Sequence, residues 1–238
     1  MSDKLYHECH EIISQGKAIL EDLQQWGFES VVPLLAEEPV AIPVQLQKGV
    51  AVPDRSRSLA ELESSLVDCR LCPLAENRNN IVFGAGSPQA RLVLVGEAPG
   101  REEDETGIPF VGEAGRLLEK ILLGMHLSRD EVYICNVLKC RPPDNRDPQP
   151  DEIAACEPFL KQQLALIQPE VIVTLGRFAA QELLKTTKPI GKLRGQWHEY
   201  EGIPLMPTFH PAYLLRNPSG KRPVWEDMKQ VMQRLNLT

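Results

Sequence analysis

From residue 91 onward, short runs of apolar residues alternate with longer segments in which apolar side chains recur every three or four positions. The short runs predict strands and the periodic segments predict helices. In chain order we expect strand 91–95, helix 114–125, strand 132–138, helix 151–167, strand 171–175, helix 178–185, strand 205–209 and helix 223–235. Strands and helices that alternate in this way form a parallel sheet covered on both faces. The pattern therefore predicts a three-layer α/β/α fold with a central, mainly parallel four-stranded sheet.

The N-terminal part of the chain has a different pattern. Residues 1–26 contain a stripe of apolar side chains at helical spacing, which predicts an amphipathic helix that packs on its own domain or docks a partner. Residues 27–57 hold several prolines without helical or alternating order and are expected to form a linker. Ser58, followed by Glu61, resembles a capping box at the start of a short helix. We therefore place the main domain at residues 58–238.

Composition and charge narrow the class of protein. The length of 238 residues suits one α/β domain with a small appendage. The net charge of −7 lies entirely in residues 1–68, which hold 5 basic and 12 acidic residues, whereas the rest holds 21 of each. An acidic protein is not expected to bind nucleic acid. Because residues 69–238 carry no net charge, this argument does not apply to the main part of the chain. The apolar runs are too short to cross a bilayer, and no signal peptide is visible. We therefore expect a cytoplasmic protein without a membrane partner.

Four of the six cysteines form two pairs, Cys69-x2-Cys72 and Cys140-x15-Cys156. In a cytoplasmic protein such cysteines are reduced or hold a metal. Four thiolates suit either Zn²⁺ or a [4Fe–4S] cluster. Only the first pair has the short spacing typical of zinc sites, which favours the cluster and leaves zinc open. The remaining cysteines, Cys9 and Cys135, are expected in the core.

Polar residues and a glycine turn follow the predicted strands. The strand ends read 96–100 (Gly-Glu-Ala-Pro-Gly), 135–137 (Cys-Asn-Val), 174–176 (Thr-Leu-Gly) and 209–211 (Phe-His-Pro). Open parallel sheets bind ligands at the carboxyl ends of their strands. We therefore expect a carboxylate, a carboxamide and an imidazole to lie together at one rim of the sheet.

The segments 96–100, 107–112 (Gly-Ile-Pro-Phe-Val-Gly) and 210–216 (His-Pro-Ala-Tyr-Leu-Leu-Arg), together with the two cysteine pairs, resemble the family 4 uracil-DNA glycosylases. The resemblance covers residues 66–238. It implies an enzyme of base-excision repair that hydrolyses uracil from DNA and leaves an abasic site. It also implies a [4Fe–4S] cluster that acts as a structural clamp, held by Cys69, Cys72, Cys140 and Cys156.

The resemblance also implies roles for individual residues. Phe110 matches the aromatic residue that stacks on the extruded base, and backbone amides around Ala98 touch the uracil. Asn136 matches the residue that reads uracil O4 and N3–H, where cytosine presents the opposite donor and acceptor pattern. His210 matches a donor to O2, where negative charge accumulates as uracil leaves.

Two acidic residues match family carboxylates. Glu97 would orient the attacking water or stabilise the cationic sugar, and Glu103 would lie near the base or the water. The loop 141–150 contains no histidine, whereas relatives that trap DNA covalently carry one in this region. We therefore expect ordinary hydrolysis with turnover.

For the DNA itself we expect Leu214 or Leu215 to fill the space of the extruded nucleotide and Arg216 to bind a phosphate. The expected backbone grip extends to Lys192, Arg194, Lys221 and Arg222. Ala212 replaces the serine common in the family, which removes a hydroxyl contact to phosphate. We expect a monomer, with residues 1–26 as a docking site for a replication or repair protein. The rival hypotheses are a noncatalytic iron–sulfur module that binds DNA or a replication protein, and a zinc-dependent nucleotide-binding protein.

Overall fold

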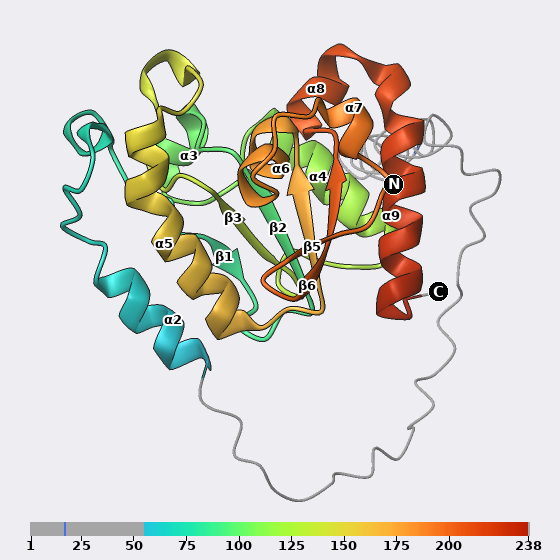
Figure 1. Cartoon of the computed structure of the whole chain (residues 1–238), viewed down its shortest axis with the longest axis horizontal. Coiled ribbons are helices and arrows are strands. Elements are labelled where there is room, and N and C mark those ends of the chain that lie inside the picture. The colour runs from blue at the N-terminus through green and yellow to red at the C-terminus, as the bar shows by residue number, and fades with distance from the viewer. Residues whose placement is uncertain (1–16, 18–54, 238) are drawn as a thin grey trace, which may run out of the picture. The chain divides into compact units, whose positions relative to one another are not determined.

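The computed structural model describes residue 17 and residues 55–237 of the chain (Figure 1). The predicted helix 1–26 and nearly all of the predicted linker 27–57 lie outside these residues, so both stay predictions. Among the described helices, none has the length and apolar character needed to cross a membrane.

The centre of the fold is a six-stranded sheet with the order β1-β3-β2-β4-β6-β5. Its four inner strands run parallel and are β2 (Leu92–Gly96), β3 (Tyr133–Asn136), β4 (Val171–Leu175) and β6 (Ile203–Thr208). The two edge strands are antiparallel and are β1 (Ala85–Gly86) and β5 (His198–Tyr200). The predicted sheet of four strands is therefore corrected to six, and the α/β class and the parallel centre are confirmed. The edge strands were missed because they have only two and three residues.

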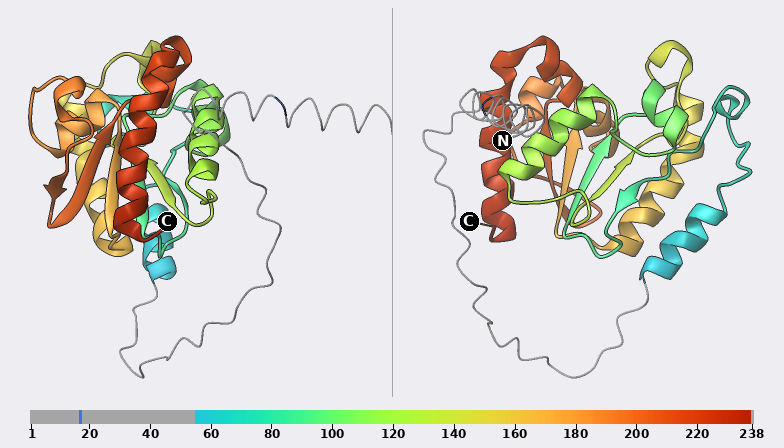
Figure 2. Two further views of the ribbon diagram at one scale, coloured as in Figure 1. Left: turned by 90° about the vertical axis from the view of Figure 1, so that its right-hand side faces the viewer. Right: turned by 180° about the vertical axis from the view of Figure 1, so that it is seen from behind.

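Helices cover both faces of the sheet, which gives the three predicted layers (Figure 2). One face carries α2 (Arg55–Ser64), α5 (Pro150–Ile167) and α6 (Arg177–Leu183). The other face carries α4 (Glu113–Gly124) and α9 (Lys221–Leu235). Short helices are α3 (Arg101–Thr106), α7 (Ile190–Leu193) and α8 (Pro211–Arg216), with 3₁₀ turns η1 (Pro73–Glu76), η2 (Pro143–Asn145) and η3 (Pro218–Gly220).

The packing follows from the apolar strands. Every residue of β2 and β4 is buried, and successive side chains point to opposite faces of the sheet. Val93 and Val95 pack on the face that carries α2, α5 and α6, so the intervening apolar residues serve the opposite face. One local prediction is wrong. Helix α2 begins at Arg55, so Ser58 lies inside the helix and does not cap it.

Candidate active site

A cavity of about 440 Å³ opens at the carboxyl ends of the parallel strands. Glu97 follows β2, Asn136 ends β3 and His210 follows β6, and all three line this cavity, as expected for the rim of the sheet. Ala98 and Phe110 also lie in its wall. Five of the residues predicted at the site, which are far apart in the chain, thus surround one space.

Phe110 and Asn136 meet across a glycine. A Cβ atom at Gly96 would lie 2.2 Å from Oδ1 of Asn136 and 2.7 Å from Cζ of Phe110, which real side chains do not tolerate. Asn136 is 2% exposed and its side-chain amide makes no hydrogen bond within the described residues. The amide is therefore free to pair with a ligand in the cavity, next to the phenyl ring.

His210 is held in one orientation. Its Nδ1 accepts a hydrogen bond of 3.1 Å from the backbone N–H of Ala212, so a neutral imidazole carries its proton on Nε2. The ring lies 5.6 Å from that of Phe110, centre to centre. Burial lowers the pKa of His210 to about 4, and Arg216 lowers it further, whereas Glu103 opposes the shift. At neutral pH the site therefore offers an uncharged N–H donor.

Glu103 is fixed by backbone amides. Its Oε1 accepts hydrogen bonds from the N–H groups of Val111 (3.0 Å) and Gly112 (3.1 Å), and its Oε2 accepts one from Gly100 (3.1 Å). The carboxylate thus ties the turn after β2 to the loop before α4. Because these bonds hold both oxygens, Glu103 organises this part of the cavity wall. Glu103 also lines the cavity, so its expected place near the base or the water stays a prediction.

Glu97 has a different setting. Its carboxyl group lies in the cavity wall and makes no hydrogen bond within the described residues. Burial raises the pKa of Glu97, the nearby Asp147 raises it further, and Arg177 opposes the rise. Glu97, unlike Glu103, therefore has a carboxyl group without hydrogen bonds from the described residues, which suits contact with a water molecule or a sugar.

The four paired cysteines surround a second cavity, which shares no lining residue with the base site. Cys69, Cys72, Cys140 and Cys156 all line it. Among the described residues, no three His, Cys, Asp or Glu side chains are close enough together to bind a single metal ion. The four thiols therefore line the same cavity without meeting at one metal position. Cys135 is fully buried in the core, as predicted.

A guanidinium group and a backbone amide contact two of the sulfur atoms. Nη1 of Arg78 lies 3.6 Å from Sγ of Cys140, and the backbone N–H of Lys139 donates to Sγ of Cys156 at 3.3 Å. Burial raises the pKa of Cys140 to about 11, so binding of a metal would release its proton. Four thiols with cationic and N–H donors around them are a donor set that fits an iron–sulfur cluster.

The predicted DNA-binding residues divide into exposed and buried ones. Leu214 is fully buried against Gly220, whereas Leu215, one position on in α8, is 44% exposed. Leu214 therefore cannot enter DNA, and Leu215 is the only one of the two that can. Arg216 lines the cavity, which suits a contact to the phosphate of an extruded nucleotide.

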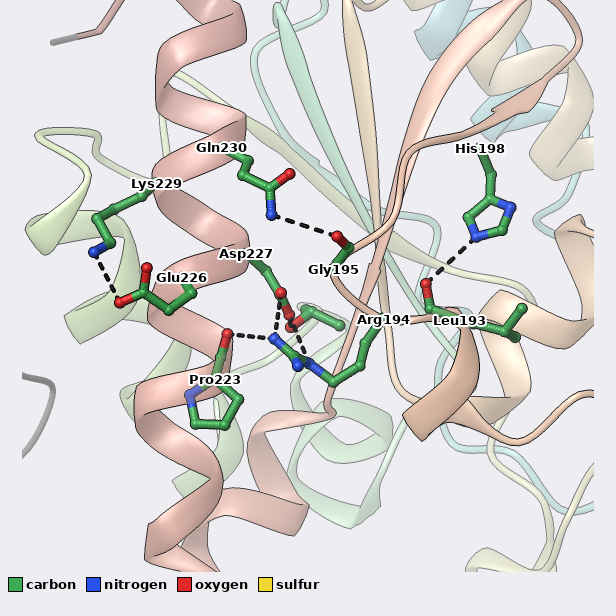
Figure 3. A network of polar contacts seen from close by, with 10 residues as sticks. Leu193, Arg194, Gly195, His198, Pro223, Glu226, Asp227, Lys229 and Gln230 are labelled. Carbon is green, nitrogen blue, oxygen red and sulfur yellow. Dashed lines mark hydrogen bonds and ion pairs between the residues drawn. The ribbon is translucent and has the colours of Figure 1, made fainter.

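Arg194 is committed to an internal ion pair (Figure 3). Its guanidinium group binds both carboxylate oxygens of Asp227 on α9 and donates to the carbonyl of Pro223 at 2.5 Å. Asp227 is buried and also accepts a hydrogen bond of 2.6 Å from Thr208, next to the end of β6. The expected DNA contact of Arg194 is therefore wrong, because the side chain joins α9 to the sheet. Lys221 is also buried.

Two exposed basic side chains from the same predicted set remain. Lys192, on α7, and Arg222, in the first turn of α9, both face solvent. These two residues therefore stay available for the sugar–phosphate backbone.

Some residues of the site were not predicted. Arg146 lies in the cavity wall and is held by Glu152, which is buried and binds its guanidinium at 2.5 and 3.0 Å. Lys139 is buried and donates to the carbonyl of Asn136 at 2.7 Å and to Oε1 of Gln163 at 2.6 Å. The only signal for Lys139 was a charged residue directly after an apolar strand, and no spacing rule marks the pair of Arg146 with Glu152.

Comparison with known proteins agrees with this arrangement. Residues 83–229 match the family model of the uracil DNA glycosylase superfamily. The chain is 49% identical over 177 residues to the type-4 uracil-DNA glycosylase of Thermotoga maritima, which covers 72% of this chain and 92% of that protein. It is 42% identical over 185 residues to the type-4 enzyme of Sulfurisphaera tokodaii (74% and 84%) and 44% identical over 184 residues to that of Archaeoglobus fulgidus (73% and 92%). The chain therefore belongs to the uracil DNA glycosylase superfamily.

Proposed function

We propose that the protein hydrolyses the N-glycosidic bond of uracil in DNA, which releases free uracil and leaves an abasic site for base-excision repair. One observation carries this proposal. The ring of Phe110, the free amide of Asn136 and the N–H of His210 line the same cavity, whose volume of about 440 Å³ accommodates a nucleotide base. Similarity to type-4 enzymes over most of the domain supports the same activity.

The cavity selects its base through Asn136 and Phe110. An amide presents one donor and one acceptor, which match O4 and N3–H of uracil. Cytosine carries the opposite pattern at these positions, so with the amide in the orientation that pairs with uracil these groups would stay unpaired, at a high cost in free energy. Phe110 stacks on the base after it has left the helix, and the backbone beside Ala98 closes the cavity.

His210 lowers the barrier to bond cleavage. As the glycosidic bond breaks, its electron pair moves into the ring of uracil and negative charge gathers on O2. The Nε2–H group is held in place by the bond between Ala212 and Nδ1, so it faces this charge without reorganising. Such a donor stabilises the transition state more than the ground state and therefore raises the rate.

Glu97 acts on the sugar side of the bond. The sugar becomes an oxocarbenium-like cation, which a carboxylate stabilises, and a water molecule completes the hydrolysis at C1′. A carboxylate without other partners in the cavity wall suits either the cation or the orientation of this water. Glu103 supports the site indirectly through its bonds to the loop 110–112.

The four paired cysteines, Cys69, Cys72, Cys140 and Cys156, would hold a [4Fe–4S] cluster. When bound, the cluster supplies a cross-link between distant segments of the chain and takes no part in the hydrolysis. The loop between Cys140 and Cys156 contributes Asn145 and Arg146 to the wall of the base cavity. The cluster thus fixes one wall of the active site. An absorbance band near 400 nm in the purified protein is the expected signature, and one bound zinc with no colour would contradict it.

On DNA, Leu215 fills the gap left by the extruded nucleotide and Arg216 binds its phosphate. Lys192 and Arg222 add contacts to the sugar–phosphate backbone. The protein acts as a monomer in the cytoplasm, and residues 1–26 dock a replication or repair protein. These last assignments rest on the sequence alone.

The test is a uracil-containing oligonucleotide incubated with the protein and then with alkali, which cleaves at abasic sites. The His210→Ala and Asn136→Ala variants should each lose activity by orders of magnitude. His198→Ala is the matched control, because His198 lies outside the cavity and its ring contacts the carbonyl of Leu193. An intact strand with the wild-type protein, or full activity in both site variants, would refute the proposal.

A further inference from the structure

The base-stacking residue has an unusual backbone. Phe110 has a φ angle of 54°, in the left-handed region that bulky side chains rarely adopt. A residue held in this region costs free energy and persists only where its surroundings impose it. The loop around Phe110 must therefore contain groups that hold the backbone in this conformation.

Arg129, in the connection between α4 and β3, supplies such a hold. Its Nη1 donates to the carbonyl of Phe110 at 2.8 Å and its Nη2 donates to the carbonyl of Pro109 at 2.5 Å. The planar guanidinium group thus binds two successive carbonyls, which a lysine cannot do with one ammonium group. Nη1 also lies 3.4 Å from Oε1 of Glu119 on α4. This ion pair helps to orient the guanidinium group.

The first turn of α4 leaves room for the carbonyl of Phe110. A Cβ atom at Gly115 would lie 1.8 Å from the carbonyl oxygen of Phe110, so glycine in the first turn of α4 is required for the approach. On the next two residues, the N–H groups of Val111 and Gly112 are bound by Glu103. The segment is therefore held through its carbonyls by Arg129 and through its amides by Glu103.

The position of the Phe110 ring shows the effect of these hydrogen bonds. It is 6% exposed, contacts the backbone of Gly96 and lies 5.6 Å from the ring of His210. Arg129 itself does not line the cavity and is 24% exposed at its side chain. Arg129 therefore acts on the base through the backbone of Pro109 and Phe110, whose carbonyls it binds.

We propose that Arg129 is a positioning residue for uracil recognition, which clamps the left-handed backbone of Phe110 so that its ring stands as a preformed platform for the extruded base. The inference rests on the proposed function. It predicts that loss of Arg129 impairs contact with the base and leaves contact with the rest of the DNA unchanged.

The experiment measures binding of two oligonucleotides, one with 2′-fluoro-2′-deoxyuridine, which resists cleavage, and one with a tetrahydrofuran abasic analogue at the same position. Arg129→Ala should bind the uracil strand about 10-fold more weakly, a change within the range that stacking of one base on an aromatic residue contributes. Binding of the abasic strand should be unchanged. The affinity of Arg129→Lys for the uracil strand should lie between those of the wild type and Arg129→Ala, because lysine reaches only one carbonyl at a time.

Two controls separate positioning from general stability. Arg91 is the matched arginine, because it also binds a carboxylate, Glu170, and a carbonyl, that of Leu235 at 2.8 Å, away from the cavity. Arg91→Ala should leave uracil binding unchanged. In a Phe110→Ala background, adding Arg129→Ala should weaken binding less than 2-fold further, since the platform is already absent.

The inference is overturned if Arg129→Ala binds the uracil strand as well as the wild type does, weakens both strands alike, or keeps its full effect in the Phe110→Ala background. If the alanine variant does not fold, Arg129→Lys carries the same comparison with a smaller expected loss. Failure of the proposed function is distinct, because the wild-type protein would then release no uracil from an ordinary uracil strand.

Discussion

Acidification should destabilise the protein through His210 in a calculable way. Burial lowers the pKa of this imidazole from the ordinary 6.5 to about 4 in the folded protein. Between these two values the unfolded chain binds a proton at His210 that the folded protein does not bind. Stability from this group is therefore complete above pH 6.5 and is lost as the pH falls toward 4.

The magnitude follows from proton linkage. At pH 8 the imidazole is neutral in both states, so it contributes nothing to the pH dependence. At pH 5 the unfolded imidazole is almost fully protonated, whereas the folded one is mostly neutral, and linkage gives a loss of about 2 kcal/mol. Protonation in the folded state is also opposed locally, because Nδ1 would then have to donate toward the N–H of Ala212.

The assay compares urea unfolding of the wild type and a His210→Gln variant at pH 8 and pH 5. Other titrating groups are common to both proteins, so the difference between their acid losses isolates His210. The wild type should lose about 2 kcal/mol more than the variant. Nitrogen-15 NMR of labelled histidine should show Nε2 protonated and Nδ1 unprotonated throughout this range. Equal acid losses in the two proteins, or titration of His210 near pH 6.5, would refute the reasoning.

Three further predictions concern Glu97, Glu103 and the contrast between Arg194 and Lys192. Glu97→Gln should slow uracil release and leave the affinity for an uncleavable uracil strand unchanged, and a loss confined to affinity would argue against a role on the sugar side. Glu103→Gln places an NH₂ group against backbone N–H donors, so it should lower stability by about 1–3 kcal/mol and weaken uracil binding. Arg194→Ala leaves the buried Asp227 without its cation and should cost about 3 kcal/mol in urea unfolding. Lys192→Ala should instead reduce the salt dependence of DNA affinity by about one counterion without a change in stability.

The sequence predicts the parallel centre of the sheet because β2 and β4 are short, largely apolar runs buried on both faces, and because helical segments separate the inner strands along the chain. It does not reveal β1 and β5, since two or three residues of mixed polarity carry no period. The short helices α3, α7 and α8 were not predicted, because four to six residues make fewer than two helical turns and show no clear period. Strand order is also hidden, because pairing of β2 with both β3 and β4 depends on contacts between distant segments.

For the site, residues at strand ends were predictable and residues fixed by distant partners were not. Asn136 and His210 follow from the rule that ligands bind at the carboxyl ends of parallel strands. Leu214 and Leu215 are equivalent in the sequence, and only the rotation of α8 buries one and exposes the other. In the sequence, Arg194 resembles an exposed cation that could bind DNA. Its ion pair with Asp227, 33 residues later, becomes visible only in the structure.

The positions of Phe110 and Asn136 in the cavity wall depend on their close packing against Gly96, and a substitution of Gly96 tests this dependence directly. Gly96→Ala adds one methyl group, whose carbon would lie 2.2 Å from Oδ1 of Asn136 and 2.7 Å from Cζ of Phe110. One or both side chains must shift, so uracil release should fall at least 10-fold, as expected when groups at an active site are displaced by about 1 Å. Gly191→Ala is the matched control, because a Cβ atom there meets nothing within 4 Å. Wild-type rates in Gly96→Ala would mean that the ring and the amide are not held as a preformed recognition site.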